Sequence, residues 1–67
     1  MLEVTVNGEK KRFDAALTLA ELVGALDLDA RKCAIERNLE IAPKSAWGSE
    51  RIADGDRIEI VCFVGGG

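Results

Sequence analysis

The chain has no histidine and no tyrosine, and only one proline and two cysteines among its 67 residues. Without histidine it lacks the commonest general base and a common zinc ligand, so we expect neither a nucleophile–base pair nor a metal site. Cys33 and Cys62 lie far apart, without a C-x-x-C pattern, and each stands among alternating apolar residues. We therefore expect two reduced thiols that act as small hydrophobic side chains in the core.

Long apolar runs and concentrated positive charge are also missing. The longest apolar run, residues 60–64, is far too short to cross a membrane, and the first residues do not form a signal peptide. The net charge is −3, and the only basic run is residues 10–12. We therefore expect a cytoplasmic protein that has neither a nucleic acid nor a membrane as a partner.

The remaining composition, 48% hydrophobic and 31% charged, is typical of one small globular domain. Apolar and polar residues alternate over residues 2–6, which predicts a half-buried strand. Asn7-Gly8 then predicts a hairpin with a returning strand at residues 10–13, because both turn residues accept a positive φ. Alternation also predicts strands at 33–36, 40–42 and 57–63.

The clearest local signal is a helix from Thr18 to Leu26. Thr18 and Glu21 have the spacing of a capping box. Four apolar residues follow at i, i+3, i+4 and i+7 and form one apolar face: Leu19, Leu22, Val23 and Leu26. Gly24 lowers the helix propensity, and we expect it to let the helix approach the sheet closely.

These elements predict an α+β fold, a mixed sheet of four to five strands with one main helix on one face. The helix connection should bring a later strand parallel to the first strand. The last strand is the most apolar, so we expect it at the centre of the sheet. The predicted organisation is a single domain over residues 1–63, followed by a flexible glycine tail at residues 64–67.

The last strand is apolar on both of its faces near its end. Ile58 and Ile60 should face the helix, whereas Val61 and Phe63 should face the opposite side, which one helix cannot cover. An uncovered apolar strand end is typical of a contact site. We predict a partner-binding surface formed by Phe63, Val61, Val64 and, from the turn after residue 37, Leu39.

The sequence ends in three glycines. Glycine has no Cβ, so Gly65 and Gly66 can stay extended and enter a channel that is too narrow for side chains. Four extended residues reach roughly 13 Å, which is enough to insert a carboxylate into the active site of another protein. A glycine-rich end is also typical of a frayed terminus or of a cloning scar, so the residues alone leave open whether the Gly67 carboxylate is presented to a partner as the reacting group.

Several segments together resemble the ThiS family of ubiquitin-like β-grasp sulfur carriers. They are V-T-V-N-G-E in the first hairpin, T-L-A-E-L in the helix, A-I-E-R-N-L-E-I-A-P-K-S in the middle, and D-G-D-R-I-E-I-V before the glycines. Leu39 departs from the pattern, because many relatives have glycine after this asparagine, and so does the additional Gly65. The resemblance implies the β-grasp fold.

The resemblance also implies a reaction. A partner enzyme related to ubiquitin-activating enzymes would adenylate Gly67 with ATP and Mg²⁺, so that the carrier itself binds no cofactor and is not an enzyme. A cysteine desulfurase or another sulfur donor would convert the adenylate into a thiocarboxylate. A thiazole synthase would then take the sulfur for thiamine thiazole biosynthesis.

Three alternatives remain open at this point. The small subunit of molybdopterin synthase also ends in two glycines, and a ubiquitin-like modifier would form isopeptide bonds instead of delivering sulfur. An enzyme using Asp54 and Asp56 as an acid–base pair is the third alternative. Because these two residues flank Gly55, we interpret them as turn residues.

Overall fold

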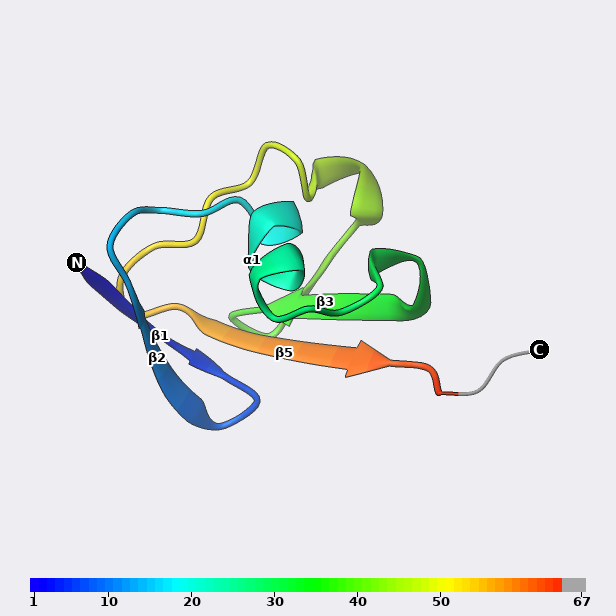
Figure 1. Ribbon diagram of the computed structural model, residues 1–67, viewed down its shortest axis with the longest axis horizontal. Helices are drawn as coiled ribbons and strands as arrows, with labels where there is room; N and C mark the ends of the chain where they lie inside the picture. The colour runs from blue at the N-terminus through cyan, green and yellow to red at the C-terminus, as the bar shows by residue number, and fades with distance from the viewer. Residues whose placement is uncertain (65–67) are drawn as a thin grey trace.

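The computed structural model describes residues 1–64, and our predictions for Gly65, Gly66 and Gly67 lie outside the described residues. The strands are β1 (Leu2–Val6), β2 (Glu9–Phe13), β3 (Cys33–Arg37), β4 (Glu40–Ala42) and β5 (Arg57–Cys62). The α-helix is α1 (Leu19–Ala25), and two short 3₁₀ helices are η1 (Ala30–Lys32) and η2 (Lys44–Ala46). Figure 1 shows these elements in chain order by colour.

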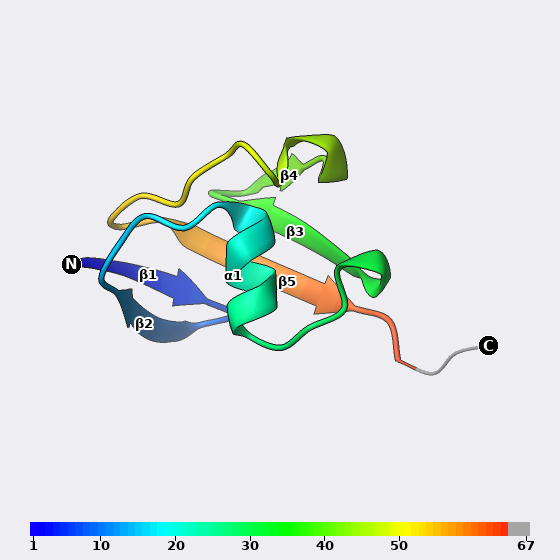
Figure 2. The ribbon, with the colours of Figure 1, turned by 45° about the horizontal axis from the view of Figure 1, so that its top comes forward.

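The strands form one mixed sheet in the order β2-β1-β5-β3-β4. β5 is parallel to β1 and antiparallel to β3, so the last strand is central, as predicted. Figure 2 shows α1 lying across one face of the sheet, over β1 and β5. The predicted α+β architecture with a helix on one face is therefore confirmed.

Helix α1 begins at the predicted capping box. Glu21 N donates to Thr18 Oγ1 at 3.1 Å, and Thr18 N donates to Glu21 Oε1 at 2.8 Å. The hydrogen bond from the Thr18 backbone is the main cause that lowers the pKa of the Glu21 carboxyl, because it stabilises the charged form. Leu22 is fully buried, as predicted.

One expectation for α1 is wrong. A Cβ built on Gly24 would meet no atom within 4 Å, so Gly24 does not mediate a close approach to the sheet. Gly24 is exposed on the outer side of the helix. The apolar face of α1 packs on the sheet through ordinary side-chain burial instead.

The core lies between α1 and the sheet. Its buried apolar residues are Val4, Val6, Leu19, Leu22, Val23, Cys33, Ile35, Ala42, Trp47, Ile52, Ile58 and Ile60. Trp47 is buried and its Nε1 donates to the Ala42 carbonyl oxygen at 2.8 Å. The irregular segment after β4 thus closes one edge of the core with a satisfied indole N–H.

Two asparagines in hairpin turns hold β5 from its two sides. Both have a positive φ, 51° for Asn7 and 52° for Asn38. The Asn7 side chain accepts from Ile60 N at 2.8 Å and donates to the Ile60 carbonyl at 3.1 Å. Asn38 Oδ1 accepts from Arg57 N at 2.9 Å. The amide side chains therefore extend the hydrogen-bonding of β5 beyond the neighbouring strands.

The expectation of two reduced thiols is wrong. Cys33 and Cys62 stand directly opposite each other in β3 and β5 and form a disulfide. The pairing depends on the register between two strands that are distant in the sequence, and alternation within each strand says nothing about that register. Cys33 is buried, as predicted, and Cys62 is half-buried against the core.

Candidate functional site

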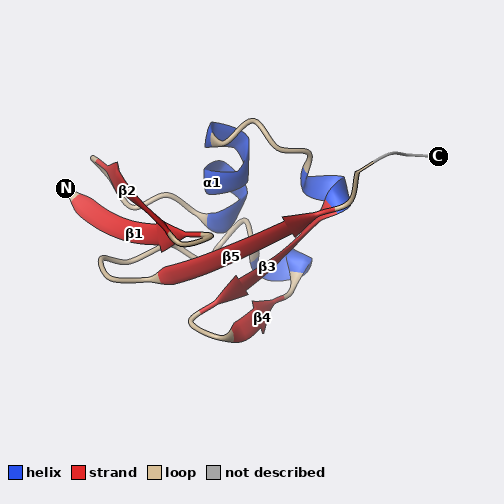
Figure 3. Cartoon of the chain, turned by 90° about the horizontal axis from the view of Figure 1, so that it is seen from below, coloured by secondary structure: helices blue, strands red, loops and turns tan. Residues whose placement is uncertain are grey.

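The candidate site is the end of β5 and the sheet face opposite α1. β5 runs away from the N terminus, and the chain leaves the sheet at its end (Figure 3). Among residues 1–64, the backbone hydrogen bond nearest the end of the chain runs from Phe63 N to the Lys32 carbonyl oxygen, at 2.7 Å. The described backbone is therefore held to β3 as far as Phe63.

The four predicted partner-binding residues are all exposed apolar side chains. Val61 is 66% exposed, Phe63 74%, Val64 97% and Leu39 74%. Val61 lies on the sheet face away from α1, because its neighbours Ile60 and Cys62 point toward the core. The predicted exposure is therefore present, and the binding role stays a prediction.

The sequence interpretation missed Ile41. This residue is 77% exposed in β4 and pairs with Glu36 of β3, on the face away from α1. A groove on this face is lined by Ala34, Ile35, Glu36, Ile41, Glu59 and Val61. The two-residue turn at Asn38-Leu39 fixes the pairing of residues 36 and 41, so the hairpin rule was the signal that could have located Ile41.

Charge on this face is distributed unevenly. Glu36 and Glu59 are cross-strand partners beside the apolar groove, and like charges directly opposite each other are destabilising. Arg57 Nη2 lies 3.7 Å from Glu59 Oε1 and offsets part of this repulsion. The groove is thus apolar with an acidic border, and a partner with basic and apolar residues would be complementary to it. We use the term open face for this groove together with the exposed side chains of Leu39, Phe63 and Val64.

The aspartates of the last turn are engaged in structure. Asp56 is buried and accepts from Arg37 Nε at 2.9 Å, Ala53 N at 2.7 Å and Asn38 Nδ2 at 3.1 Å. Asp54 Oδ1 accepts from Glu3 N at 2.7 Å. These contacts support our interpretation of both residues as turn residues.

The described residues offer little else for chemistry. Residues 1–64 contain no group of three side chains suited to holding a metal ion. Within the same residues, no helix has the length and apolar character needed to span a bilayer.

The sequence of the chain matches known proteins over nearly its whole length. The model of the ThiS family matches residues 4–67. The chain is 36% identical over 67 residues to the sulfur carrier protein ThiS of Bacillus subtilis, and this similarity covers 100% of both chains. It is 48% identical over 66 residues to a thiazole synthase of Paramagnetospirillum magneticum, covering 98% of this chain and 20% of that protein.

The chain thus spans about a fifth of the length of the thiazole synthases that it matches. Its fold is also similar to the crystal structure of the thiamine biosynthesis protein ThiS from Geobacter metallireducens. The TM-score is 0.84 at 33% identity, over 98% of this chain and 100% of that chain. From the family match and this common ubiquitin-like β-grasp fold, we conclude that the chain belongs to the ThiS family.

Proposed function

We propose that this chain is a sulfur carrier of thiamine thiazole biosynthesis whose Gly67 carboxylate is the reacting group. The observation that carries the proposal is that the family match extends to residue 67 and so includes the glycine tail. The family membership and the exposed apolar end of β5 support a protein that docks on partners and presents its own terminus.

A carboxylate is a poor electrophile, so the reaction needs activation. A partner enzyme related to ubiquitin-activating enzymes joins the Gly67 carboxylate to the α-phosphate of Mg-ATP and releases pyrophosphate. The terminal sulfur of a persulfide, supplied by a cysteine desulfurase or another donor, attacks the acyl carbon, and AMP leaves. A further thiol cleaves the S–S bond of the resulting acyl disulfide, which leaves a thiocarboxylate on Gly67 and a disulfide as the second product.

In this proposal the chain contributes binding and positioning. Docking through the open face makes the reaction of the Gly67 carboxylate effectively intramolecular, which raises its effective concentration at the nucleotide. Gly65 and Gly66 keep the tail narrow. ATP and Mg²⁺ belong to the partner, and we propose that the chain acts in the cytoplasm as a co-substrate, not as an enzyme.

The 48% identity to part of a thiazole synthase favours a thiazole synthase as the acceptor over the large subunit of molybdopterin synthase. The two acceptors are distinguished by presenting the thiocarboxylate form to each purified synthase and measuring sulfur transfer. Conjugates to lysines that survive boiling in detergent and reductant would instead indicate a ubiquitin-like modifier.

The direct test is ATP–pyrophosphate exchange with the cognate adenylating enzyme, followed by intact mass spectrometry. Mass analysis of the protein from its native host establishes whether Gly67 is the terminus and whether a terminal oxygen is replaced by sulfur. Deleting Gly67 moves the acid back by roughly 3.3 Å, and a misplacement of about 1 Å can cost ~10²-fold in rate. We expect exchange to be lost in this variant.

The second variant is Gly66→Val, whose β-branched side chain widens the tail and should also abolish exchange. Its matched control is Gly48→Val, because Gly48 is exposed and a Cβ there meets no atom within 4 Å. The control should keep full exchange. If the chain without Gly67 is adenylated as well as the full chain, the proposed role of this terminus is wrong.

A further inference from the structure

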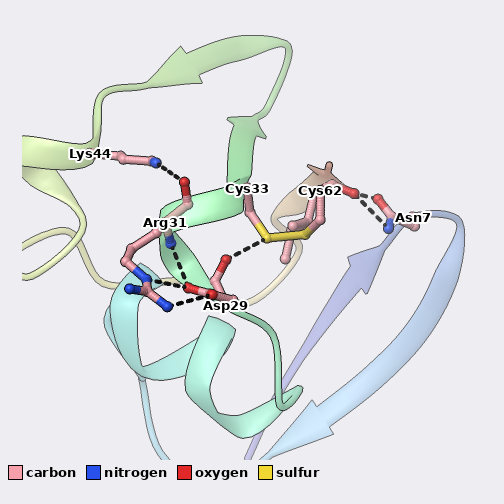
Figure 4. Close-up of a disulfide and its surroundings, with 7 residues drawn as sticks. Asn7, Asp29, Arg31, Cys33, Lys44 and Cys62 are labelled. Carbon is pink, nitrogen blue, oxygen red and sulfur yellow. Dashed lines mark hydrogen bonds and ion pairs between the residues drawn. A yellow bond between two sulfur atoms is a disulfide. The ribbon is translucent and has the colours of Figure 1, made fainter. Parts of the chain in front are cut away.

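The disulfide lies at the base of the tail. Cys62 is the last residue of β5, and Cys33 is the first residue of β3 (Figure 4). The Phe63 N–H bonds to the Lys32 carbonyl, so the hydrogen bond lies outside the cysteine pair and the pair itself is not hydrogen-bonded. In antiparallel sheets such pairs bring their side chains closest together. The register alone therefore places the two sulfurs within bonding reach.

We propose that Cys33 and Cys62 form a reversible thiol–disulfide couple that controls how firmly the tail-bearing end of β5 is anchored. The effect on docking rests on the proposed function, whereas the couple itself does not. In a cytoplasmic protein disulfides are usually transient and redox-responsive, so a cross-strand pair at this place fits a site of reversible modification by thiols.

The burial of the two sulfur-bearing residues sets the order of the reaction. Cys33 is 3% exposed, whereas Cys62 is half-buried, so an external thiolate reaches Cys62 first. The thiolate bonds to Cys62 Sγ, the S–S bond breaks, and Cys33 leaves as a thiolate that takes up a proton. A second thiol then attacks the sulfur that came from the first and releases Cys62 as a thiol. Two external thiols are oxidised to a disulfide, and the chain gains two electrons and two protons.

The buried Cys33 thiol has a hydrogen-bond acceptor within reach in the reduced form. Cys33 Sγ lies 3.1 Å from the carbonyl oxygen of Asp29, which can accept a hydrogen bond once the sulfur carries a proton. Asp29 is itself held by Arg31, whose backbone N donates to Asp29 Oδ1 at 3.0 Å. The β3–β5 pairs from Ile35–Ile60 to Arg37–Ile58 and the apolar core beneath α1 do not depend on the S–S bond. We therefore expect reduction to leave the domain folded.

Reduction removes the disulfide that holds the end of β5 to β3. The next side-chain contact toward the start of β5 is the pair of hydrogen bonds between the Asn7 side chain and the Ile60 backbone. Val61 and Phe63, the exposed apolar residues of the open face, stand on either side of Cys62. Fraying back to Ile60 releases residues 61–63 and moves the last held residue back by roughly 10 Å of extended chain, at ~3.3 Å per residue. The oxidised form thus presents an ordered contact surface and the reduced form a disordered one.

The first experiment follows the couple in the full-length protein. The protein is equilibrated in buffers with stepped ratios of reduced to oxidised glutathione, and with a dithiol reductant, and then labelled with a maleimide. With the labelling step done in denaturant, intact mass should show a shift from no label to two labels, while the far-ultraviolet circular dichroism of the protein before denaturation stays unchanged. Two labels in every glutathione buffer would overturn the proposal, and so would no label at any glutathione ratio.

The second experiment locates the effect by amide hydrogen exchange. Reduction should accelerate exchange at Val61–Val64 and leave the β1–β2 hairpin and α1 unchanged. The variant with both Cys33→Ala and Cys62→Ala should exchange like the reduced form and should not respond to reductant. Equal exchange at Val61–Val64 in the oxidised and reduced forms would overturn the anchoring role.

The third experiment measures docking through adenylation kinetics. The KM for the carrier should rise roughly five- to tenfold on reduction while kcat stays the same, since only the ordering of the contact residues changes. An unchanged KM would overturn the link between anchoring and docking. If neither redox form is adenylated, the proposed function fails, and the couple is still judged by labelling and exchange.

Discussion

Replacing Leu39 by glycine should make the domain more stable and at the same time a poorer binding partner. Leu39 has a φ of 72° in the turn between β3 and β4. The left-handed region costs a non-glycine residue roughly 1–2 kcal/mol, and glycine removes this cost. Glycine also gives the unfolded chain more freedom, which offsets roughly 0.5–1 kcal/mol of the gain. Since the Leu39 side chain is 74% exposed, its removal forfeits little burial.

For Leu39→Gly these two ranges leave a gain of about 0–1.5 kcal/mol in the free energy of unfolding, with a midpoint of about 0.75 kcal/mol. At roughly 4–8 °C per kcal/mol for a domain of this size, the midpoint corresponds to a rise of about 3–6 °C in the melting temperature. Urea unfolding followed by circular dichroism measures the gain through the midpoint at constant slope. Leu39→Asn is the matched control, because asparagine tolerates a positive φ and removes the apolar side chain as well.

The same two variants should weaken adenylation by the partner, because both remove an exposed apolar contact from the open face. A loss of stability in both variants would refute the argument from backbone strain and would show that the leucine side chain stabilises the turn. Full adenylation at limiting carrier concentration would remove Leu39 from the partner-binding surface. A non-glycine residue kept in a strained turn is typical of functional sites, which is the physical basis for expecting both effects.

Three further predictions concern α1. Leu22→Ala should cost roughly 2–5 kcal/mol in urea unfolding, because this side chain is fully buried, and an unchanged midpoint would contradict the packing of α1 on the sheet. Gly24→Ala should stabilise by up to ~1 kcal/mol in the same assay, since the added methyl meets open space; destabilisation would show a contact there. The pKa of Glu21 is lowered from 4.5, so its stabilisation is present above pH 4.5 and is lost as the pH falls through the lower folded-state pKa. Glu21→Gln keeps the capping box and should flatten this acid dependence, whereas an unchanged pH profile would assign it to other carboxylates.

The sequence was sufficient for the elements whose signals are local. The capping box at Thr18 and Glu21 located the start of α1, and Asn7-Gly8 located the first hairpin turn, because in both cases the determining residues are within a few positions of each other. The central place of β5 also followed, since a strand that is apolar along most of its length needs neighbours on both sides.

Apart from Ile41, whose place follows from a local turn, the features that sequence reasoning missed depend on contacts between distant segments. The disulfide needs the register of β3 against β5, and no tight turn connects these strands to fix it. The bonds from Asn7 to Ile60 join residues that are 53 positions apart, so a turn residue gained a second role that its local pattern does not reveal. The groove on the open face likewise combines β3, β4 and β5.

Under the proposed function, the central position of β5 gives the segment before the glycines a firmly held origin. An edge strand is hydrogen-bonded on one side and frays from its end, and each lost bond would shift the direction of the tail. β5 is bonded to β1 and β3, and the Asn7 side chain continues the β1 side as far as Ile60. On the β3 side, β5 is also held by the Cys33–Cys62 disulfide and by the hydrogen bond from Phe63 N to the Lys32 carbonyl oxygen. The chain beyond Phe63 therefore continues from a strand that is hydrogen-bonded on both sides. Among the described residues beyond Ile60, the bond that redox chemistry can break is the Cys33–Cys62 disulfide, which lies next to the exposed residues Val61 and Phe63.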